Sequence, residues 1–288
     1  MGAVQGVSPW SCHDASAIAM VNWNDPVLLL RNYQTFDKLT HVAGGIYIWE
    51  FVTHLDFDWH VLTGARKYRW TYLLYSGCRL SALFAVVTVF TGFDAQYRIK
   101  CQAWVVFTFI LTYLAFVFAS VLIVLRIMAI WECRRLVVIV AWVTWLANTA
   151  FYIHSVITAR STWFPEAGFC VILHSIRSRI NIIATLVADL VLVTLMLFGL
   201  LRWQHAGQFR GVCRFLYNQG LIWIVVVTLA EVPSTVMIVM DLDDPWNLMF
   251  QVPELITMAI GATRIYRGLA DYTSITELRT LPGNTQKP

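Results

Sequence analysis

Apolar stretches alternate along the chain with short polar or basic breaks, and each stretch has the length of about 20 residues that a helix needs to cross a bilayer. Tryptophan and tyrosine stand at many of the boundaries, where amphipathic rings favour the headgroup layer, although such rings also pack between helices. We therefore predict seven spanning helices, at Leu39–Trp59, Trp70–Gly92, Trp104–Trp131, Leu136–Thr158, Ile180–Trp203, Phe215–Met240 and Trp246–Tyr266.

The first of these spans is the least regular, because His41, Glu50 and His54 interrupt it. We expect it to be buried or tilted rather than to lie on the membrane surface. Residues 1–38 are expected to form an extramembrane segment without a cleaved signal peptide, since the apolar run Val27–Leu30 is too short for one. Residues 39–267 form the predicted membrane domain, and residues 268–288 form a predicted cytosolic tail.

The composition agrees with lipid as the main solvent. The 288 residues are 58% hydrophobic and 13% charged, with a mean hydropathy of +0.63, whereas soluble domains carry about 25% charged residues. These values exclude an ordinary soluble enzyme and a disordered chain, and six cysteines are too few for a small disulfide scaffold. The predicted fold class is an all-α bundle of seven transmembrane helices, in the plasma membrane or an endomembrane.

The distribution of basic residues sets the predicted orientation. With the amino terminus outside, the inner segments carry twelve Lys and Arg residues and the outer segments carry seven. Because basic residues concentrate on the cytosolic side, this difference favours an external amino terminus and a cytosolic carboxyl terminus. The membrane then explains the net charge of +4, and we expect no nucleic-acid partner.

Two cysteines fall on the outer, oxidising side under this orientation. Cys101 is at the start of the third span, and Cys170 is in the loop after the fourth. We predict a disulfide between them, which would pin the longest outer loop to the bundle. The alternative is that both are small apolar residues that fill space.

Several charged residues fall within the predicted spans, where each costs about 2.5 to 3.5 kcal/mol at a helix centre and needs a partner. Glu50 and Arg79 lie at similar depths on neighbouring spans, so we expect a buried structural pair, with a catalytic or ligand-binding Glu50 as the alternative. Asp56 and Asp58 are expected to pair with the basic loop that follows them. Arg126 lies near the inner end of its span, and its long side chain is expected to reach the interface.

Three acidic residues, Asp189, Glu231 and Glu254, lie at comparable depths in the outer half, with no lysine or arginine at that depth. They cannot all be ionised in a low-dielectric bundle without a cation or shared protons. Pro233 and Pro253 lie close to two of them and are expected to kink their spans. We predict that the acids line one ligand-binding cavity; the alternative is that each is protonated and bonded to a backbone carbonyl. Further polar residues that could line this cavity are Asn148, His154 and Asn181.

Motifs for several enzyme classes are absent from the sequence. The chain has no paired-histidine zinc motif, no glycine-rich phosphate loop and no Gly-x-Ser-x-Gly elbow, and its histidines are scattered. The seventh predicted span contains no lysine for a retinal Schiff base, which excludes a rhodopsin. We expect no metal and no cofactor.

The strings YIWEFVTHLDFDW, GARKYRWTYLLYS, LIVLRIMAIW, AEVP and DPWNLMFQVPELITMAIGATRIYR together resemble a large family of basidiomycete fungal seven-helix membrane proteins. The resemblance covers the chain from about Asp37 to Asp271. It implies the seven-span fold, and family members also carry cysteines that match Cys101 and Cys170. These proteins are described only as integral membrane proteins with a domain of unknown function, so the resemblance implies no activity and no catalytic residue.

Three functions stay open on the sequence alone. The first is a receptor-like or sensing bundle whose acidic cavity, lined by Asp189, Glu231 and Glu254, binds a small ligand or cation and acts on a cytosolic signalling partner. The second is an intramembrane enzyme of fungal natural-product biosynthesis, such as an acid-initiated terpenoid cyclase, with Glu50 beside Trp49, or Glu231, as the acid. The third is a proton-coupled carrier that uses the three acids as a relay.

Overall fold

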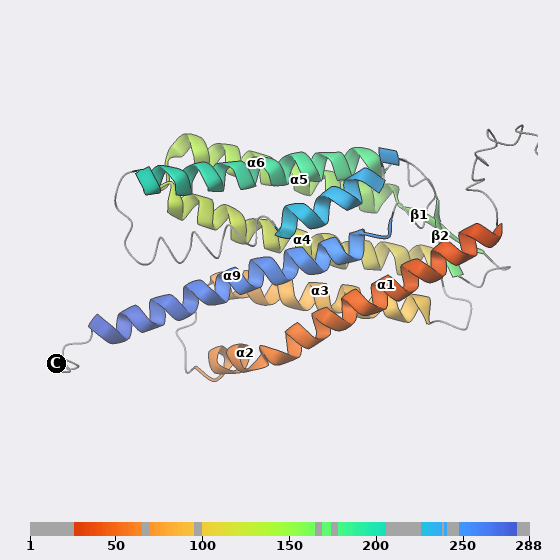
Figure 1. Cartoon of the computed structure of the whole chain (residues 1–288), viewed down its shortest axis with the longest axis horizontal. Coiled ribbons are helices and arrows are strands. Elements are labelled where there is room, and N and C mark those ends of the chain that lie inside the picture. Colours follow the sequence, from red (N-terminus) through yellow and green to blue (C-terminus); the bar gives the residue numbers. More distant parts are fainter. Residues whose placement is uncertain are drawn as a thin grey trace, which may run out of the picture.

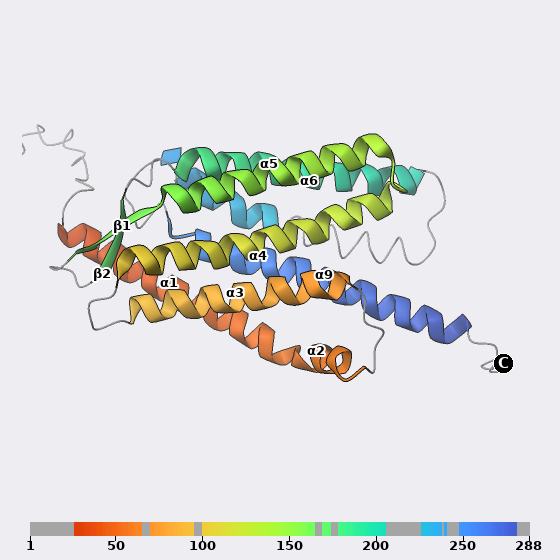
Figure 2. The same ribbon diagram turned by 180° about the vertical axis from the view of Figure 1, so that it is seen from behind.

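The computed structural model describes residues 26–64, 70–94, 100–164, 169–173, 178–205, 226–237, 239–240 and 248–280. Within these ranges nearly every residue is helical, which confirms the all-α class. The long helices pack side by side and alternate in direction (Figure 1). Figure 2 shows the same bundle from behind, with a small β-hairpin at one end and the carboxyl-terminal helix extending past the other.

The elements in chain order are α1 (Pro26–Thr53), α2 (Leu55–Leu62), α3 (Thr71–Phe93), α4 (Cys101–Ile130), α5 (Arg135–Thr158), β1 (Arg160–Phe164), β2 (Phe169–Leu173), α6 (Ser178–His205), a helix at Val226–Met237, and α9 (Gln251–Thr280). The first predicted span is therefore two helices that meet at His54, and the first of them begins well before Leu39. Proline suits the first turn of a helix, where its missing N–H has no intrahelical partner. Residues 215–225 of the sixth predicted span lie outside the described residues.

Four helices are long and apolar enough to cross a membrane: α3, α4, α5 and the Ile180–Gly199 part of α6. These four agree closely with the second to fifth predicted spans. The helix Val226–Met237 is apolar but shorter. Several charged residues, such as Asp37 and Glu50, stand in α1, and the second half of α9 is polar. The chain is thus a multi-pass membrane protein by these four helices.

Large apolar side chains cover the outer surface of the bundle. Trp49 of α1, Leu73 of α3 and Phe198 of α6 expose 72%, 61% and 62% of their surface. Soluble monomers rarely expose contiguous apolar surface on this scale, whereas a helix surrounded by lipid does so without cost. The interior contains small and medium residues such as Cys78, Ala82 and Ala119, which allow the helices to approach closely.

Helix α4 lies at the centre of the bundle, where it contacts α3, α5, α6 and α9. Its carboxyl end leads into α5 through a tight turn at Trp131–Arg134, in which Glu132 and Cys133 have positive φ. We call the end of the bundle with this turn and α2 the turn end. The opposite end carries the antiparallel pair of β1 and β2, in which Trp163 faces Cys170, and we call it the hairpin end.

Candidate functional site

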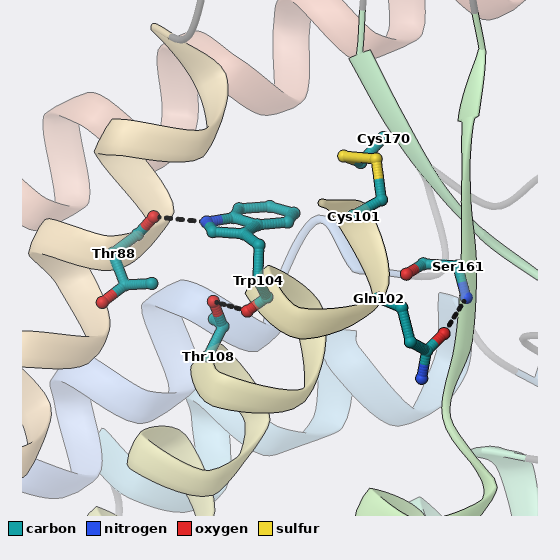
Figure 3. Close-up of a disulfide and its surroundings, with 7 residues drawn as sticks. All are labelled: Thr88, Cys101, Gln102, Trp104, Thr108, Ser161 and Cys170. Atoms are coloured by element: carbon teal, nitrogen blue, oxygen red, sulfur yellow. Dashed lines mark hydrogen bonds between the residues drawn. A yellow bond between two sulfur atoms is a disulfide. The ribbon is translucent and has the colours of Figure 1, made fainter. Parts of the chain in front are cut away.

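The first turn of α4 is fixed to three other elements at the hairpin end (Figure 3). Cys101 forms a disulfide with Cys170 of β2, with 5.5 Å between their Cα atoms, which confirms the predicted bridge. The Gln102 side chain accepts a hydrogen bond from the Ser161 backbone N–H at 3.0 Å and donates one to the Ala159 carbonyl at 2.9 Å. Trp104 donates its indole N–H to the Thr88 carbonyl of α3 at 2.8 Å. These contacts hold the hairpin firmly over this end of the bundle.

A cavity of about 170 Å³ lies beneath the hairpin, among α1, α3, α4, α5, α6 and α9, and we call it the hairpin-end cavity. Its wall is mainly aromatic, and it includes the disulfide through Cys170. An apolar cavity of about 150 Å³ can bind benzene, so the space suits a ligand of roughly one aromatic ring. The aromatic residues of the wall are Tyr33, Phe36, Phe93, Trp104, Phe109, Tyr113, Phe116 and Tyr152.

Among the described residues that line this cavity, Glu254 is the one with a charged side chain. It lies in the first turn of α9, three residues after the helix begins at Gln251. Pro253 occupies the same first turn and therefore starts α9 rather than kinking it. A carboxylate at this position is stabilised by the amino-terminal end of the helix dipole. Polar neighbours in the wall are Thr108, Asn181, Thr185 and Gln251.

The other two predicted acids meet each other deeper in the bundle. Asp189 of α6 is 4% exposed and Glu231 is 5% exposed, and their carboxyl groups are within hydrogen-bonding reach of each other. Glu254 is near enough to interact electrostatically with both. The structure thus brings the three acids together, but they do not line one cavity. Glu254 lines the hairpin-end cavity, Asp189 lines a different one, and Glu231 lines neither.

The second cavity has a volume of about 40 Å³, lies between α4, α6, Val226–Met237 and α9, and is called the central cavity here. Of the lining residues that the structure describes, Arg126 and Asp189 are charged and the others are apolar. The Arg126 Nη2 atom is buried without a hydrogen-bond partner, so the expectation that this side chain reaches the interface is wrong. The Asp189 Oδ1 atom is also buried and has no hydrogen-bond partner.

A separate ionic cluster joins α1 to α9 at the turn end. Glu50 accepts hydrogen bonds from Arg264 at 2.9 and 2.5 Å and from Arg267 at 2.7 Å, and His54 lies 3.1 Å from the same carboxylate. The predicted pair of Glu50 with Arg79 is therefore wrong. Arg264 and Arg267 are one helical turn apart, which places both guanidinium groups on the face of α9 that meets Glu50.

Arg79 instead forms a buried ion pair with Asp58 of α2, at 2.5 Å. Its guanidinium also donates to the Tyr75 hydroxyl at 2.7 Å and to the Phe51 carbonyl at 2.6 Å. The predicted partners of Asp58, in the basic loop 66–69, lie outside the described residues. Sequence reasoning missed this pair because the break at His54, which turns α2 back toward α3, was not foreseen.

The three predicted polar lining residues have different positions. Asn181 lines the hairpin-end cavity as expected. Asn148 is buried, donates to the Tyr152 hydroxyl at 3.1 Å and accepts from Thr185 at 3.2 Å, so it supports the wall from behind. His154 is exposed on the surface of α5 and takes no part.

Within the described ranges, no group of three His, Cys, Asp or Glu side chains is arranged to hold a metal ion. No protein-family model matches the chain, and no curated protein is significantly similar to it. The resemblance to the basidiomycete family therefore stays a prediction, and the function has to be argued from the two cavities and the charges around them.

Proposed function

We propose that this protein is a receptor-like or sensing membrane bundle that binds a small cationic aromatic ligand in the hairpin-end cavity, with Glu254 as the counter-charge. The observation that carries the proposal is a wall of aromatic faces with one carboxyl group at its edge. Aromatic faces attract cations and organic rings, and a carboxyl group at the cavity wall can supply the counter-charge when a cation enters. An amine attached to one ring matches both features and the cavity volume.

The position of α9 supports a sensing role. Its first turn carries Glu254, and one residue later Leu255 also lines the cavity. About three turns further on, Arg264 and Arg267 attach the same helix to Glu50 of α1. A ligand that contacts the first turn of α9 therefore acts on a rigid element that reaches the turn end, where α9 extends beyond the other helices (Figure 1). Signalling requires that α9 can adopt two positions in the bundle and that the ligand binds more tightly to one of them.

The acid-initiated enzyme has less support, because its candidate acids do not face a cavity. Glu50 is held by two arginines, and the neighbouring Trp49 points to the outer surface with 72% exposure. A general acid must reach the substrate, and neither Glu50 nor Glu231 lines either cavity. We therefore favour a ligand-binding function over a catalytic one.

The seven-span topology and the orientation belong to the same proposal. The alternating directions of α1, α3, α4, α5, α6, Val226–Met237 and α9 suit seven crossings (Figure 2). The disulfide at the hairpin end suits an oxidising compartment, so we place this end outside and the turn end in the cytosol, in the plasma membrane or an endomembrane.

The proposal is tested by thermal unfolding of the purified full chain in detergent, with 2-phenylethylamine as probe and the uncharged 2-phenylethanol as control ligand. We expect the amine to raise the unfolding temperature of the wild type and of Glu231→Gln, because a ligand that binds only the folded state stabilises it. Glu254→Gln should lose this effect. Equal stabilisation of wild type and Glu254→Gln, or none of the wild type, would overturn the proposal.

A further inference from the structure

A histidine joins α1 to the end of α3 beside the hairpin-end cavity. The His41 ring of α1 stacks on Phe90 of α3, with 4.5 Å between the ring centroids and 7° between the ring planes. Gly44, about one turn later on α1, allows this close approach, because a Cβ atom there would collide with the same Phe90 ring. Packing therefore fixes the position and the orientation of the imidazole.

Each nitrogen of this imidazole faces an acceptor. Nδ1 lies 3.0 Å from the backbone carbonyl oxygen of Asp37 and 3.0 Å from its carboxylate, and Nε2 lies 3.6 Å from the carboxylate of Asp94. Carbonyl and carboxylate oxygens can only accept, so Nδ1 has to carry a proton. In the neutral ring Nε2 would then present a lone pair to Asp94, whereas in the charged ring it presents an N–H. The arrangement therefore favours the imidazolium.

The contact lies at the edge of the bundle, where solvent reaches it. Asp94 caps the end of α3 and its side chain is 73% exposed, so His41, which is 36% exposed, is level with the end of that span. Burial of the ring acts to lower the pKa of His41, but the Asp37 carbonyl and the two carboxylates outweigh it and raise the pKa above its usual value. Among the described residues, the other titratable groups on this part of α1 are Tyr33 and Lys38.

The same end of α3 also holds the α1 part of the cavity wall. Tyr33 and Phe36 of α1 pack edge-on against Phe93 of α3, with centroid distances of 5.4 and 5.2 Å, and all three residues line the hairpin-end cavity. The His41 ring lies 6.5 Å from the Phe93 ring. The contact at His41 is therefore next to the aromatic contacts that form the wall between α1 and α3.

We propose that His41, Asp37 and Asp94 form a pH-sensitive clamp that holds α1 against α3 at the wall of the hairpin-end cavity. When His41 is protonated, its charge bridges one carboxylate on each helix. After deprotonation the bridge to Asp94 becomes a contact between two acceptors, and the aromatic contacts have to hold α1 there without it.

The direction of the pH effect follows from the state that the clamp favours. Because the folded protein favours protonated His41, the clamp contributes its full stability below about pH 6.5, the pKa of a free histidine. This contribution is lost as the pH rises through the higher pKa of His41 in the folded protein. The clamp acts on the wall itself and does not depend on the ligand proposed for the cavity.

The clamp is tested by thermal unfolding of the full chain in lipid nanodiscs at two pH values. At about pH 5.5 the wild type should unfold about 1 to 3 °C above Asp94→Asn, the shift expected for one exposed ion pair, and at about pH 8.5 the difference should disappear. His41→Gln should abolish this pH dependence, whereas His154→Gln, which replaces an exposed histidine of α5, should leave it intact. An equal difference at both pH values, or one that survives His41→Gln, would overturn the proposal.

Nuclear magnetic resonance of the full chain with isotope-labelled histidine measures the protonation directly. The signal that is missing from His41→Gln identifies the ring. In the wild type this signal should titrate above about pH 6.5, and in Asp94→Asn it should titrate at a lower pH than in the wild type. This readout does not depend on stability, and Asp94→Asn alters an exposed side chain, so we expect the variant to fold. Titration below that of free histidine, or titration unchanged by Asp94→Asn, would overturn the proposal.

Discussion

Buried charged residues occur in two regions of this bundle, and the two regions differ in whether these residues have direct partners. At the turn end the Glu50 carboxylate has direct bonds to Arg264 and Arg267 and contact with His54. At the centre, Asp189 and Arg126 share a cavity with buried atoms that have no direct partner. Direct pairing fixes helices in place, whereas a charge that faces a cavity keeps its capacity to bind water, a proton or a ligand. The turn end is therefore structural, and the centre with the hairpin end is where binding is expected.

The largest effect is expected from Glu50→Gln at the turn end. The substitution leaves Arg267, which is 7% exposed, without its carboxylate, and breaking a buried ion pair costs about 3 to 5 kcal/mol. Chemical unfolding in detergent should show this loss of folding free energy. Asp37→Asn, which alters a half-exposed carboxylate on the same helix, is the matched control and should have little effect. A loss no larger than that of the control would contradict a structural role for the cluster.

The next effect concerns the disulfide that closes the hairpin end. Replacing both Cys101 and Cys170 with serine frees a loop with a sequence separation of 69 residues, and loss of a native disulfide over such a loop costs about 2 to 4 kcal/mol. The unfolding temperature should fall, and binding of the amine probe should weaken because Cys170 belongs to the wall. Replacing the buried free Cys78 with serine is a control that should leave probe binding intact.

A smaller effect is expected where α3 meets α4 near the same cavity. A methyl group added at Gly92 would lie 2.0 Å from the Trp104 ring, which is held by its hydrogen bond to Thr88. Gly92→Ala should therefore displace the ring and destabilise the fold by about 1 to 3 kcal/mol. The matched control is Gly45→Ala, because a methyl group there meets nothing within 4 Å. If both variants unfold at the same temperature, the contact does not constrain the bundle.

The smallest effect is expected from Glu231→Gln at the centre. The amide keeps the size of the side chain and removes no direct ion pair, so the folding free energy should change by less than about 1 kcal/mol. The free energies of unfolding of Glu231→Gln and Glu50→Gln can be compared directly by chemical unfolding. Both variants replace Glu with Gln at a buried residue, since Glu231 is 5% exposed and Glu50 is 8% exposed. Equal losses in the two variants would remove the distinction between the two regions.

Much of the fold could be predicted from the sequence, because lipid imposes simple rules on length and polarity. Helices α3, α4, α5 and α6 begin and end close to the predicted boundaries, and the disulfide followed from the placement of its two cysteines. The meeting of Asp189, Glu231 and Glu254 also followed from their depths. The spacing of apolar residues and the depth of a residue in its span belong to a single helix, so both can be read from the sequence.

The wrong predictions concern side chains whose partner could come from any of several neighbouring helices. Depth alone favoured Arg79 as the partner of Glu50, whereas the rotation of α9 presents Arg264 and Arg267 to it. Arg126 was judged by its neighbours along the chain, which are apolar, while its acidic neighbour comes from α6. The hairpin of β1 and β2 was missed as well, although the aromatic and β-branched residues of Arg160–Phe164 and Phe169–Leu173 are typical of strands.

Cys170 is both a wall residue of the hairpin-end cavity and one half of a disulfide, so the final form of this wall depends on oxidation after synthesis. A newly made chain carries reduced thiols. The disulfide between Cys170 and Cys101 adds a covalent link to the Gln102 hydrogen bonds that hold the hairpin, and it forms only where an oxidant is present. For the proposed ligand, the cavity wall is then completed only after oxidation, and a copy with reduced thiols would keep the hydrogen bonds of the hairpin but lack the covalent link.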